Sequence, residues 1–398
     1  MSTKILLAGF GTMGRYYADA VIKNAAAWNV ELVGIVDTDP ARVADLPDSV
    51  PFFQDIRDAL GQTGPQLVIN ATNNESHIDI IRALEAHPEV KGFLAEKPLV
   101  NSGPEEVEAT ARLATHFVSM NMITNFSAAS IGLKEWVDAN PRLKLIGLEG
   151  VWGKDRRADT RPTPGIANDI VHPVGLMQSI FNVRNWDLKR ADGLYGTLST
   201  DRAGNKVDCV YQYDLAFDTD VAPVRMDCSF AWKQQARRVS AFFEKPDGGY
   251  TAAELFLDEA GEGGRSDFFC IHDISADFKT ASCIYESPRA MDNKLAAYVE
   301  RSLRVLRGEA PAESSGLIGL QEEEAIGAVY NLLYPSGNRA DLMKCAHLNI
   351  ADVSPQDAPV VPGLPALDQE TAAGLEKRIR AFTPQTAKPV NGPAAPSL

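Results

Sequence analysis

The chain has 398 residues, of which 45% are hydrophobic and 23% charged, and its formal net charge is −14. This composition is typical of a globular protein with room for two domains, and the acidic balance argues against nucleic acid or an anionic membrane surface as a partner. The five cysteines are scattered without a C-x-x-C pair, so we expect neither a metal site nor a disulfide framework. No apolar run suits a spanning helix or a signal peptide, which predicts a cytoplasmic location.

Residues 1 to about 121 alternate apolar strands with amphipathic helices. Strands are predicted at "KILLAG", "VELVGIVD", "PQLVINAT", "GFLAE" and "FVSMNM", and helices at about 13–27, near "DIRDALG", at 77–87 and at 104–114. Apolar strands interleaved with helices indicate a parallel sheet that is covered on both faces. We assign residues 1–125 to a Rossmann domain of the α/β class.

The loop after the first strand contains Gly9, Gly11 and Gly14 in the spacing G-x-G-x-x-G. The glycines allow a tight turn, the approach of a phosphate, and close packing of helix on strand, which a bound pyrophosphate requires. Asp37 ends the second strand, where a carboxylate accepts from ribose hydroxyls and repels a 2′-phosphate. This favours NAD, with NADP possible because Arg42 lies nearby. The predicted cofactor contacts in this region are Gly9, Phe10, Gly11, Thr12, Met13, Gly14, Asp37 and Thr38.

The tripeptide Glu-Lys-Pro occurs twice, beginning at Glu96 and at Glu244. The first copy follows the apolar run "GFLA" at the carboxyl end of a parallel strand, where open α/β sheets bind ligands. The second copy follows an antiparallel strand and leads into the turn "PDGG", so we expect a solvated hairpin end there. Glu96 and Lys97 are therefore the candidates for chemistry.

From about residue 140 the pattern becomes β-rich. The segments "LKLIGLEGVWG", "DCVYQYDLAFD", "VRMDCSFAWK", "RVSAFFEK" and "TAAELFLDE" indicate a mostly antiparallel sheet, with helices at about 169–181, 290–306 and 316–333. We assign residues 126–335 to an α+β domain for substrate binding and oligomerisation. Residues 336–398 form a C-terminal extension that ends in a Pro- and Ala-rich tail, which we expect to be loose.

The motifs "GFGTMG", "ATNNESH", "AEKP" and "GIANDIVH", in this two-domain order, resemble those of the Gfo/Idh/MocA oxidoreductases, the family of glucose-fructose oxidoreductase and inositol dehydrogenase. The resemblance implies a Rossmann domain followed by an α/β domain with a large open sheet. It also implies that Lys97 lies between nicotinamide and substrate, with Glu96 near the nicotinamide. The family's T-P-N-x-x-H segment, which lines the cofactor, matches Thr72, Asn74 and His77, with Asn73 in place of proline.

Family members usually carry D-x-x-x-H at the start of a helix in the second domain, and its histidine transfers the proton. Here Asn168 lies four residues before His172 and Asp169 three before it, and either spacing places the two side chains on one helix face. A histidine is suited to shuttle a proton near neutral pH, and a carboxylate can hold its ring. Whether Asn168 or Asp169 partners His172 stays open, as does a helix cap beside a core histidine.

Two regions are candidates for substrate contact. Asn121 follows the last strand of the first domain, and the basic loop "WGKDRRADTRPTPG" contains Arg156, Arg157 and Arg161. A guanidinium group there suits a carboxylate or phosphate on the substrate. The alternative is that these arginines pair with the neighbouring aspartates on a solvated loop.

The sequence predicts an NAD(P)-dependent dehydrogenase or reductase that acts on a hydroxyl, ketone or imine carbon of a small polar, sugar-like or acidic substrate. Two alternatives stay open: a dinucleotide-binding regulator without turnover, and an enzyme of hydrolysis or elimination with tightly held NAD. Because broad sheet faces are rarely left to water, we expect a homodimer or homotetramer, with Tyr211, Tyr213, Phe230 and Trp232 on the face that packs.

Overall fold

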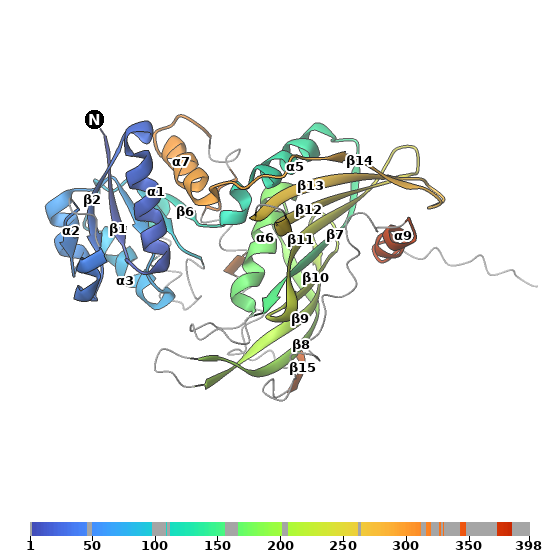
Figure 1. Cartoon of the computed structure of the whole chain (residues 1–398), viewed down its shortest axis with the longest axis horizontal. Helices are drawn as coiled ribbons and strands as arrows, with labels where there is room; N and C mark the ends of the chain where they lie inside the picture. The colour runs from blue at the N-terminus through green and yellow to red at the C-terminus, as the bar shows by residue number, and fades with distance from the viewer. Residues whose placement is uncertain are drawn as a thin grey trace, which may run out of the picture.

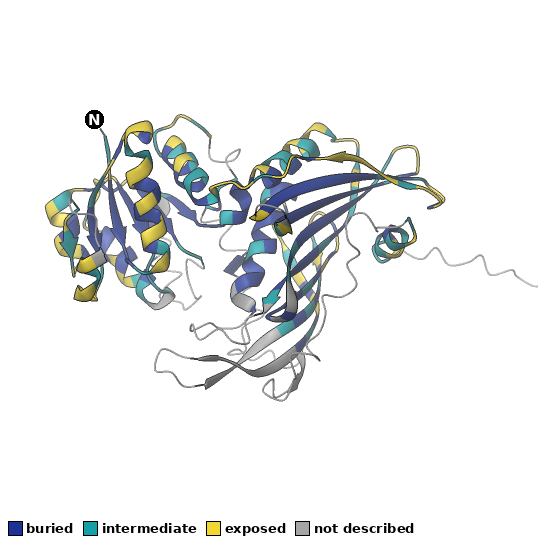
Figure 2. Ribbon diagram, in the orientation of Figure 1, coloured by how far each residue is buried: buried dark blue, intermediate teal, exposed yellow. Residues whose placement is uncertain are grey.

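The protein is represented by a computed structural model, which describes residues 2–45, 50–97, 109, 112–155, 166–200, 206–261, 264–311, 316–319, 326–327, 329, 343–347 and 372–383. These residues form two sheets with helices packed on them (Figure 1). Figure 2 shows that the buried residues concentrate in the sheets and on the helix faces that are turned toward them. In the described part of the chain, no helix combines the length and apolarity needed to cross a bilayer.

The first sheet is parallel and has the strand order β3-β2-β1-β4-β5-β6. The order reverses between β1 and β4, which is where open α/β sheets bind their ligands. This sheet confirms the predicted Rossmann fold. Its strands are β1 (Thr3–Ala8), β2 (Val30–Val36), β3 (Phe52–Phe53), β4 (Leu67–Asn70), β5 (Gly92–Ala95) and β6 (Phe117–Met120).

Helices cover both faces of the first sheet. On one face, α1 (Thr12–Trp28) packs beside α7 (Lys294–Leu306), and the hydroxyl of Tyr298 in α7 donates to the Ser119 carbonyl at 2.9 Å. On the other face lie α2 (Ile56–Thr63) and α3 (Asn74–Leu84). A helix that follows the second sheet in sequence therefore returns to complete the core of the first.

Two helices begin at other residues than predicted. α3 begins at Asn74 rather than near His77, because Asn73 has an extended backbone (φ −77°, ψ 160°) that places it at the N-cap. α7 begins at Lys294 rather than near Ala290, because the Asn293 side chain accepts from the third residue of the helix at 3.1 Å. The predicted helices at 104–114 and 316–333 lie largely outside the described residues.

The second sheet has nine strands in the order β14-β13-β12-β11-β7-β10-β9-β8-β15. All neighbours are antiparallel except the pairs β7–β10 and β8–β15, so the prediction of a mostly antiparallel sheet is confirmed. The strands are β7 (Lys144–Asp155), β8 (Trp186–Thr200), β9 (Lys206–Thr219), β10 (Val224–Ser229), β11 (Ala231–Glu244), β12 (Tyr250–Gly261), β13 (Gly264–Ile274), β14 (Ala281–Glu286) and β15 (Met343–His347).

Several strands of this sheet were not predicted, β8, β13 and β14 among them. In β8 the reason is charge: Lys189, Arg190 and Asp192 interrupt the apolar alternation, and Arg190 pairs across the sheet with Asp214 of β9 at 2.6 Å. The segment "VRMDCSFAWK", predicted as one strand, is divided between β10 and the start of β11, which lie on opposite sides of β7, because the chain bends at Phe230.

Helices α5 (Ala128–Ala139) and α6 (Ala167–Phe181) cover the inner face of the second sheet. The outer face carries α9 (Ala372–Arg380), whose Leu375 and Ile379 pack on Phe242. The prediction of an open aromatic face is wrong for Tyr213, Phe230 and Trp232, which are buried within the single chain. The Tyr211 side chain and the tail after residue 383 lie outside the described structure.

Candidate cofactor and active site

The loop between β1 and α1 is shaped by its glycines. Gly9 has φ +88°, and a Cβ there would lie 2.7 Å from the backbone of Ala71. A Cβ at Gly14 would collide with the Gly9 carbonyl oxygen. By contrast, no described atom lies within 4 Å of a Cβ built on Gly11. The fold therefore requires the first and third glycines, and open space adjoins the second.

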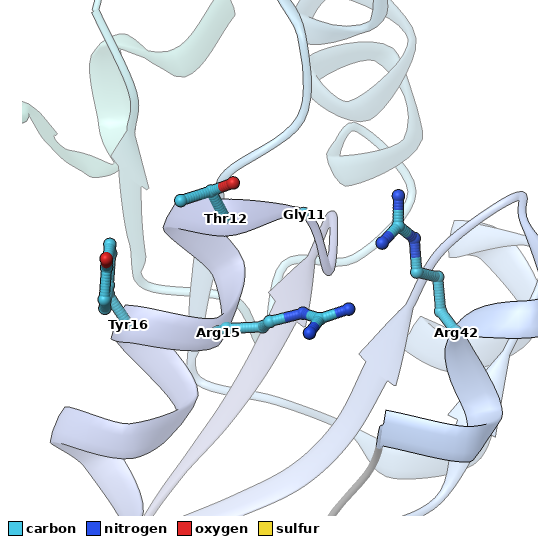
Figure 3. A pocket seen from close by; sticks show the side chains of 5 residues that line it. All are labelled: Gly11, Thr12, Arg15, Tyr16 and Arg42. Carbon is cyan, nitrogen blue, oxygen red and sulfur yellow. The ribbon is translucent and has the colours of Figure 1, made fainter.

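The N-terminus of α1 is open to an anion. Gly11 is the N-cap of this 17-residue helix, with no side-chain cap and no acidic residue in the first turn. Unpaired amides and the helix dipole favour negative charge at such an end. A cavity of about 560 Å³ adjoins it, lined by Gly11, Thr12, Arg15, Tyr16 and Arg42. Figure 3 shows Arg15, from α1, and Arg42 extending their guanidinium groups toward each other across this cavity.

Asp37 lies at the edge of the same region. Its Oδ2 accepts from the Phe10 amide at 2.7 Å and its Oδ1 from the Asp39 amide at 3.0 Å, so the half-buried carboxylate ties the glycine loop to the end of β2. Arg42 pairs with Asp39 at 3.4 Å, and Thr38 is exposed. A carboxylate and a guanidinium group thus both stand where the ribose end of a dinucleotide is predicted.

The segment after β4 forms a self-bonded turn. The Thr72 hydroxyl donates to Asn70 Oδ1 at 2.7 Å, and the Ser76 hydroxyl donates to Asn73 Oδ1 at 3.0 Å. His77 is buried, and its Nε2 lies 3.4 Å from the Thr72 carbonyl oxygen, so the side chain contacts the backbone of the turn. Ala71, at the start of the turn, touches the glycine loop. The Asn74 side chain lies outside the described structure.

Glu96, directly after β5, is held by two neutral donors. The Tyr17 hydroxyl of α1 donates to its Oε1 at 3.0 Å, and the Asn121 amide donates to the same oxygen at 2.8 Å. Burial, with the nearby Glu96 charge, raises the pKa of Tyr17 well above its ordinary value. Asn121, predicted to touch substrate, is buried and here positions Glu96.

Asp169 of the second domain lies between two lysines, Lys97 and Lys154. Lys97 Nζ lies 3.8 Å from Asp169 Oδ1, and Lys154 Nζ lies 2.7 Å from Asp169 Oδ2. The three groups come from the end of β5, the end of β7 and the first turn of α6. Asp169 is only 5% exposed. Burial alone would raise its pKa, but the ammonium groups of Lys97 and Lys154 hold the pKa well below its usual range.

His172 lies one turn further along α6. Its ring stacks on Trp152 at 5.7 Å between centroids and 22° between planes, and Nδ1 has no hydrogen-bond partner among the described residues. Burial lowers the pKa of His172 well below its ordinary value, and Lys97, Arg237 and Lys154 lower it further while Asp169 opposes them. The imidazole is therefore neutral near pH 7.

The structure brings together Lys97, Asp169 and His172, as predicted, but the tight partner of Asp169 is Lys154. Lys154 was not predicted as a site residue. The signal was available, because Leu148, Trp152 and Lys154 occupy alternate positions of β7 that face α6. The Asn168 side chain, and Arg156, Arg157 and Arg161, lie outside the described structure.

The second Glu-Lys-Pro copy forms surface ion pairs. Lys245 pairs with Asp273 at 2.7 Å, and Glu244 pairs with Lys144 at 3.1 Å, in the turn between β11 and β12. No cofactor-binding segment adjoins it among the described residues, in agreement with the predicted hairpin end.

The first domain is similar in sequence to a known protein family. Residues 3–122 match the model of the family described as "oxidoreductase family, NAD-binding Rossmann fold" (GFO_IDH_MocA). None of the curated proteins matches the chain in sequence. A variant of KijD10, a 3-ketoreductase from Actinomadura kijaniata in complex with TDP-benzene and NADP, is 13% identical with a TM-score of 0.63, covering 87% of this chain and 100% of that one.

A second solved structure is the UDP-N-acetylglucosamine 3-dehydrogenase GnnA from Acidithiobacillus ferrooxidans. It is 15% identical with a TM-score of 0.60, covering 84% of this chain and 97% of that one. Likenesses at such identities show a shared fold, and here that fold includes both sheets. The sequence match over residues 3–122 shows that the first domain is similar to the NAD-binding Rossmann domain of the Gfo/Idh/MocA oxidoreductases.

Proposed function

We propose that the chain is a dehydrogenase or reductase that acts on a hydroxyl or ketone carbon of a sugar-like substrate, with Lys97 and His172 at the reacting oxygen and NAD as the preferred cofactor. The observation that carries the proposal is that Lys97, at the carboxyl end of the parallel sheet, lies 3.8 Å from Asp169 of α6, one turn before His172, whose Nδ1 has no hydrogen-bond partner among the described residues. Both residues of the family motifs are present in this chain, which favours an enzyme over a regulator without turnover.

The residues near α1 fit a dinucleotide. The open space at Gly11, the uncapped helix end and Arg15 suit a pyrophosphate, and Asp37 suits a ribose. The nicotinamide, when bound, supplies or accepts the hydride. Arg42 also lines the cavity and would tolerate a 2′-phosphate, so Asp37 and Arg42 act in opposite directions on the choice between NAD and NADP.

The proton chemistry belongs to the chain itself. In the oxidation direction a neutral His172 takes the proton of the substrate hydroxyl at a ring nitrogen, and in reduction it returns that proton. The Lys97 ammonium donates a hydrogen bond to the same oxygen and stabilises the negative charge that develops on it. Asp169 offsets part of the charge of the two lysines.

A sugar-like substrate is supported by the names of the two similar structures, a 3-ketoreductase and a UDP-N-acetylglucosamine 3-dehydrogenase. Arg156, Arg157 and Arg161 remain candidates for binding an anionic group of the substrate. The cytoplasmic location and the homo-oligomer remain predictions.

The test is turnover with NAD and with NADP on a panel of free sugars, nucleotide-linked sugars and hydroxy acids, followed by the absorbance of the reduced nicotinamide. We expect release of free reduced cofactor, since an enzyme with tightly held NAD would release none. Asp37→Ser should weaken NAD relative to NADP about tenfold or more. An unchanged cofactor preference in that variant would show that Asp37 does not face the ribose.

A further inference from the structure

We propose that Lys154 is a positioning residue of the active site: it holds Asp169 between two ammonium groups and away from His172, which leaves the histidine available to the substrate. The inference rests on the proposed function and deepens it. It assigns a task to a lysine of the second domain that reaches the same carboxylate as Lys97.

Lys154 is fixed in place by its surroundings. It belongs to the inward-facing residues of β7, two positions after Trp152, and its ammonium lies 5.6 Å from the ring centroid of Phe230. A cation over an aromatic face is attracted to it, so Phe230 steadies the lysine from one side while Asp169 binds it from the other. The side chain is 23% exposed, so part of it reaches solvent.

The two lysines are not equivalent partners of Asp169. The distance of 2.7 Å from Lys154 is that of a strong charge-assisted hydrogen bond, whereas 3.8 Å from Lys97 is longer than any hydrogen bond. Asp169 is therefore anchored by Lys154. Lys97 lies beyond hydrogen-bond distance of the carboxylate, so its attraction to Asp169 is electrostatic.

The orientation of His172 does not depend on a carboxylate in the described structure. Trp152 stacks on its ring, and the hydrogen bond of Asp169 goes to Lys154. Without Lys154, the carboxylate would be drawn to Lys97 or to His172. Either movement would engage a group that the reaction needs.

The charges that face His172 come from four elements. They are Lys97 after β5, Lys154 of β7, Asp169 of α6, and Arg237 of β11, which lies over the Trp152 ring and is paired with Asp258. Removal of the Lys154 charge leaves one cation fewer near the imidazole. The pKa of His172 then rises, because a nearby cation disfavours the imidazolium and Lys154 is one of the cations that lower it.

The experiment compares Lys154→Met with Lys154→Arg. We expect Lys154→Met to lower kcat at least about tenfold with less than about threefold change in KM, and to move the acid limb of the kcat profile to higher pH. Lys154→Arg keeps the charge and should restore both most of kcat and the position of the acid limb. The titration of His172 by NMR, assigned with His172→Ala in protein without cofactor, should shift to higher pH in Lys154→Met only.

The matched control is Lys144→Met. Lys144 is on the same strand and also pairs with a carboxylate, Glu244, at 3.1 Å, but its side chain is 75% exposed. Both kcat and the His172 titration should be unchanged there. If Lys154→Met does not fold, as judged by circular dichroism, Lys154→Gln replaces it.

Two results would overturn the proposal. One is a Lys154→Met or Lys154→Gln protein with the parent kcat and the parent His172 titration. The other is a Lys154→Arg protein as impaired as the Met variant, with an unshifted titration. The titration separates this failure from that of the proposed function: a parent protein without turnover on the panel contradicts the function, while the His172 shift still decides the placement of Lys154.

Discussion

Each face of the nine-stranded sheet buries one carboxylate between two cations, and the two clusters differ in what the cations are. On the inner face, Asp169 is held by Lys154 and Lys97. On the outer face, Glu254 is 1% exposed and is held by Arg378 of α9 at 2.8 Å and by Arg238 at 3.5 Å.

Arg378 is bonded through all three of its guanidinium nitrogens. Arg378 donates to Glu149 at 2.8 Å, to Glu254 at 2.8 Å and to the Ser240 hydroxyl at 2.7 Å, and its guanidinium lies 4.9 Å from the ring centroid of Phe242. A planar guanidinium with several fixed donors suits such permanent bonding, whereas a flexible lysine adapts to reaction chemistry. The contrast indicates that the outer cluster stabilises the fold and that the inner cluster acts on a ligand.

The outer cluster also contains the donor types of a metal site. Glu254, Cys270 and His272 have their ligand atoms within 4.8 Å of one another, and Cys270 Sγ lies 3.3 Å from His272 Nε2. The charge of Glu254 is already compensated by Arg378 and Arg238, so a cation placed there would meet positive charge on its far side. We assign this cluster to the docking of α9.

The largest expected effect of a substitution is a loss in the free energy of unfolding at Arg378. Arg378→Ala leaves Glu254 and Glu149 without their main partner under α9, and truncating one side of a buried ion pair costs about 3–5 kcal/mol. The free energy of unfolding from urea titrations should fall by that amount, while kcat at low temperature stays near the parent value. A loss below about 1 kcal/mol would show that α9 is only loosely held.

Substitutions in the inner cluster should lower kcat rather than the free energy of unfolding. Lys97→Ala and His172→Ala should each lower kcat about a hundredfold or more, because both groups act on the reacting oxygen, with NAD affinity nearly unchanged. The measurements are initial rates and NAD titrations by fluorescence. Parent rates in either variant would remove that residue from the chemistry, and a lost NAD affinity would assign it to cofactor binding.

Sequence patterns identified the parts of the fold that depend on local chemistry. Gly9 and Gly14 are required by contacts within one strand, turn and helix, and Lys97 follows a buried strand, so each is visible in a short window. His172 and Asp169 were found through a motif with one substitution. The contact of Asp169 with Lys154 depends on the register of β7 against α6, which no motif encodes.

The C-terminal helix shows the same limit more strongly. No helix was predicted over residues 372–380, because this short segment stands in a Pro- and Ala-rich extension. Arg378 meets Glu149 and Glu254, which lie 229 and 124 residues away in sequence. These ion pairs, and the packing of Leu375 and Ile379 on Phe242, depend on residues that are distant in sequence.

A third carboxylate sharpens the comparison, because it lies half-buried on the outer face near two like charges. Asp227 of β10 lies near Asp214 and Glu149, and burial together with these two carboxylates raises its pKa to about 6. The folded state then binds a proton more tightly than the unfolded state. Its contribution to stability is present below about pH 4 and is lost as the pH rises through about 6.

Asp227→Asn should therefore stabilise the protein at neutral pH and leave its stability near pH 4 unchanged. The pKa shift sets an upper limit of about 3 kcal/mol, and because Asp227 is partly exposed to solvent we expect about 1 kcal/mol. Thermal unfolding at pH 4 and pH 7.5 measures the effect, with Asp187→Asn on the exposed surface of β8 as the control. Equal changes at both pH values would contradict the raised pKa. A gain at neutral pH alone would show that a carboxylate in this sheet is stabilising only where a cation is built in beside it, as Lys154 is beside Asp169 and Arg378 beside Glu254.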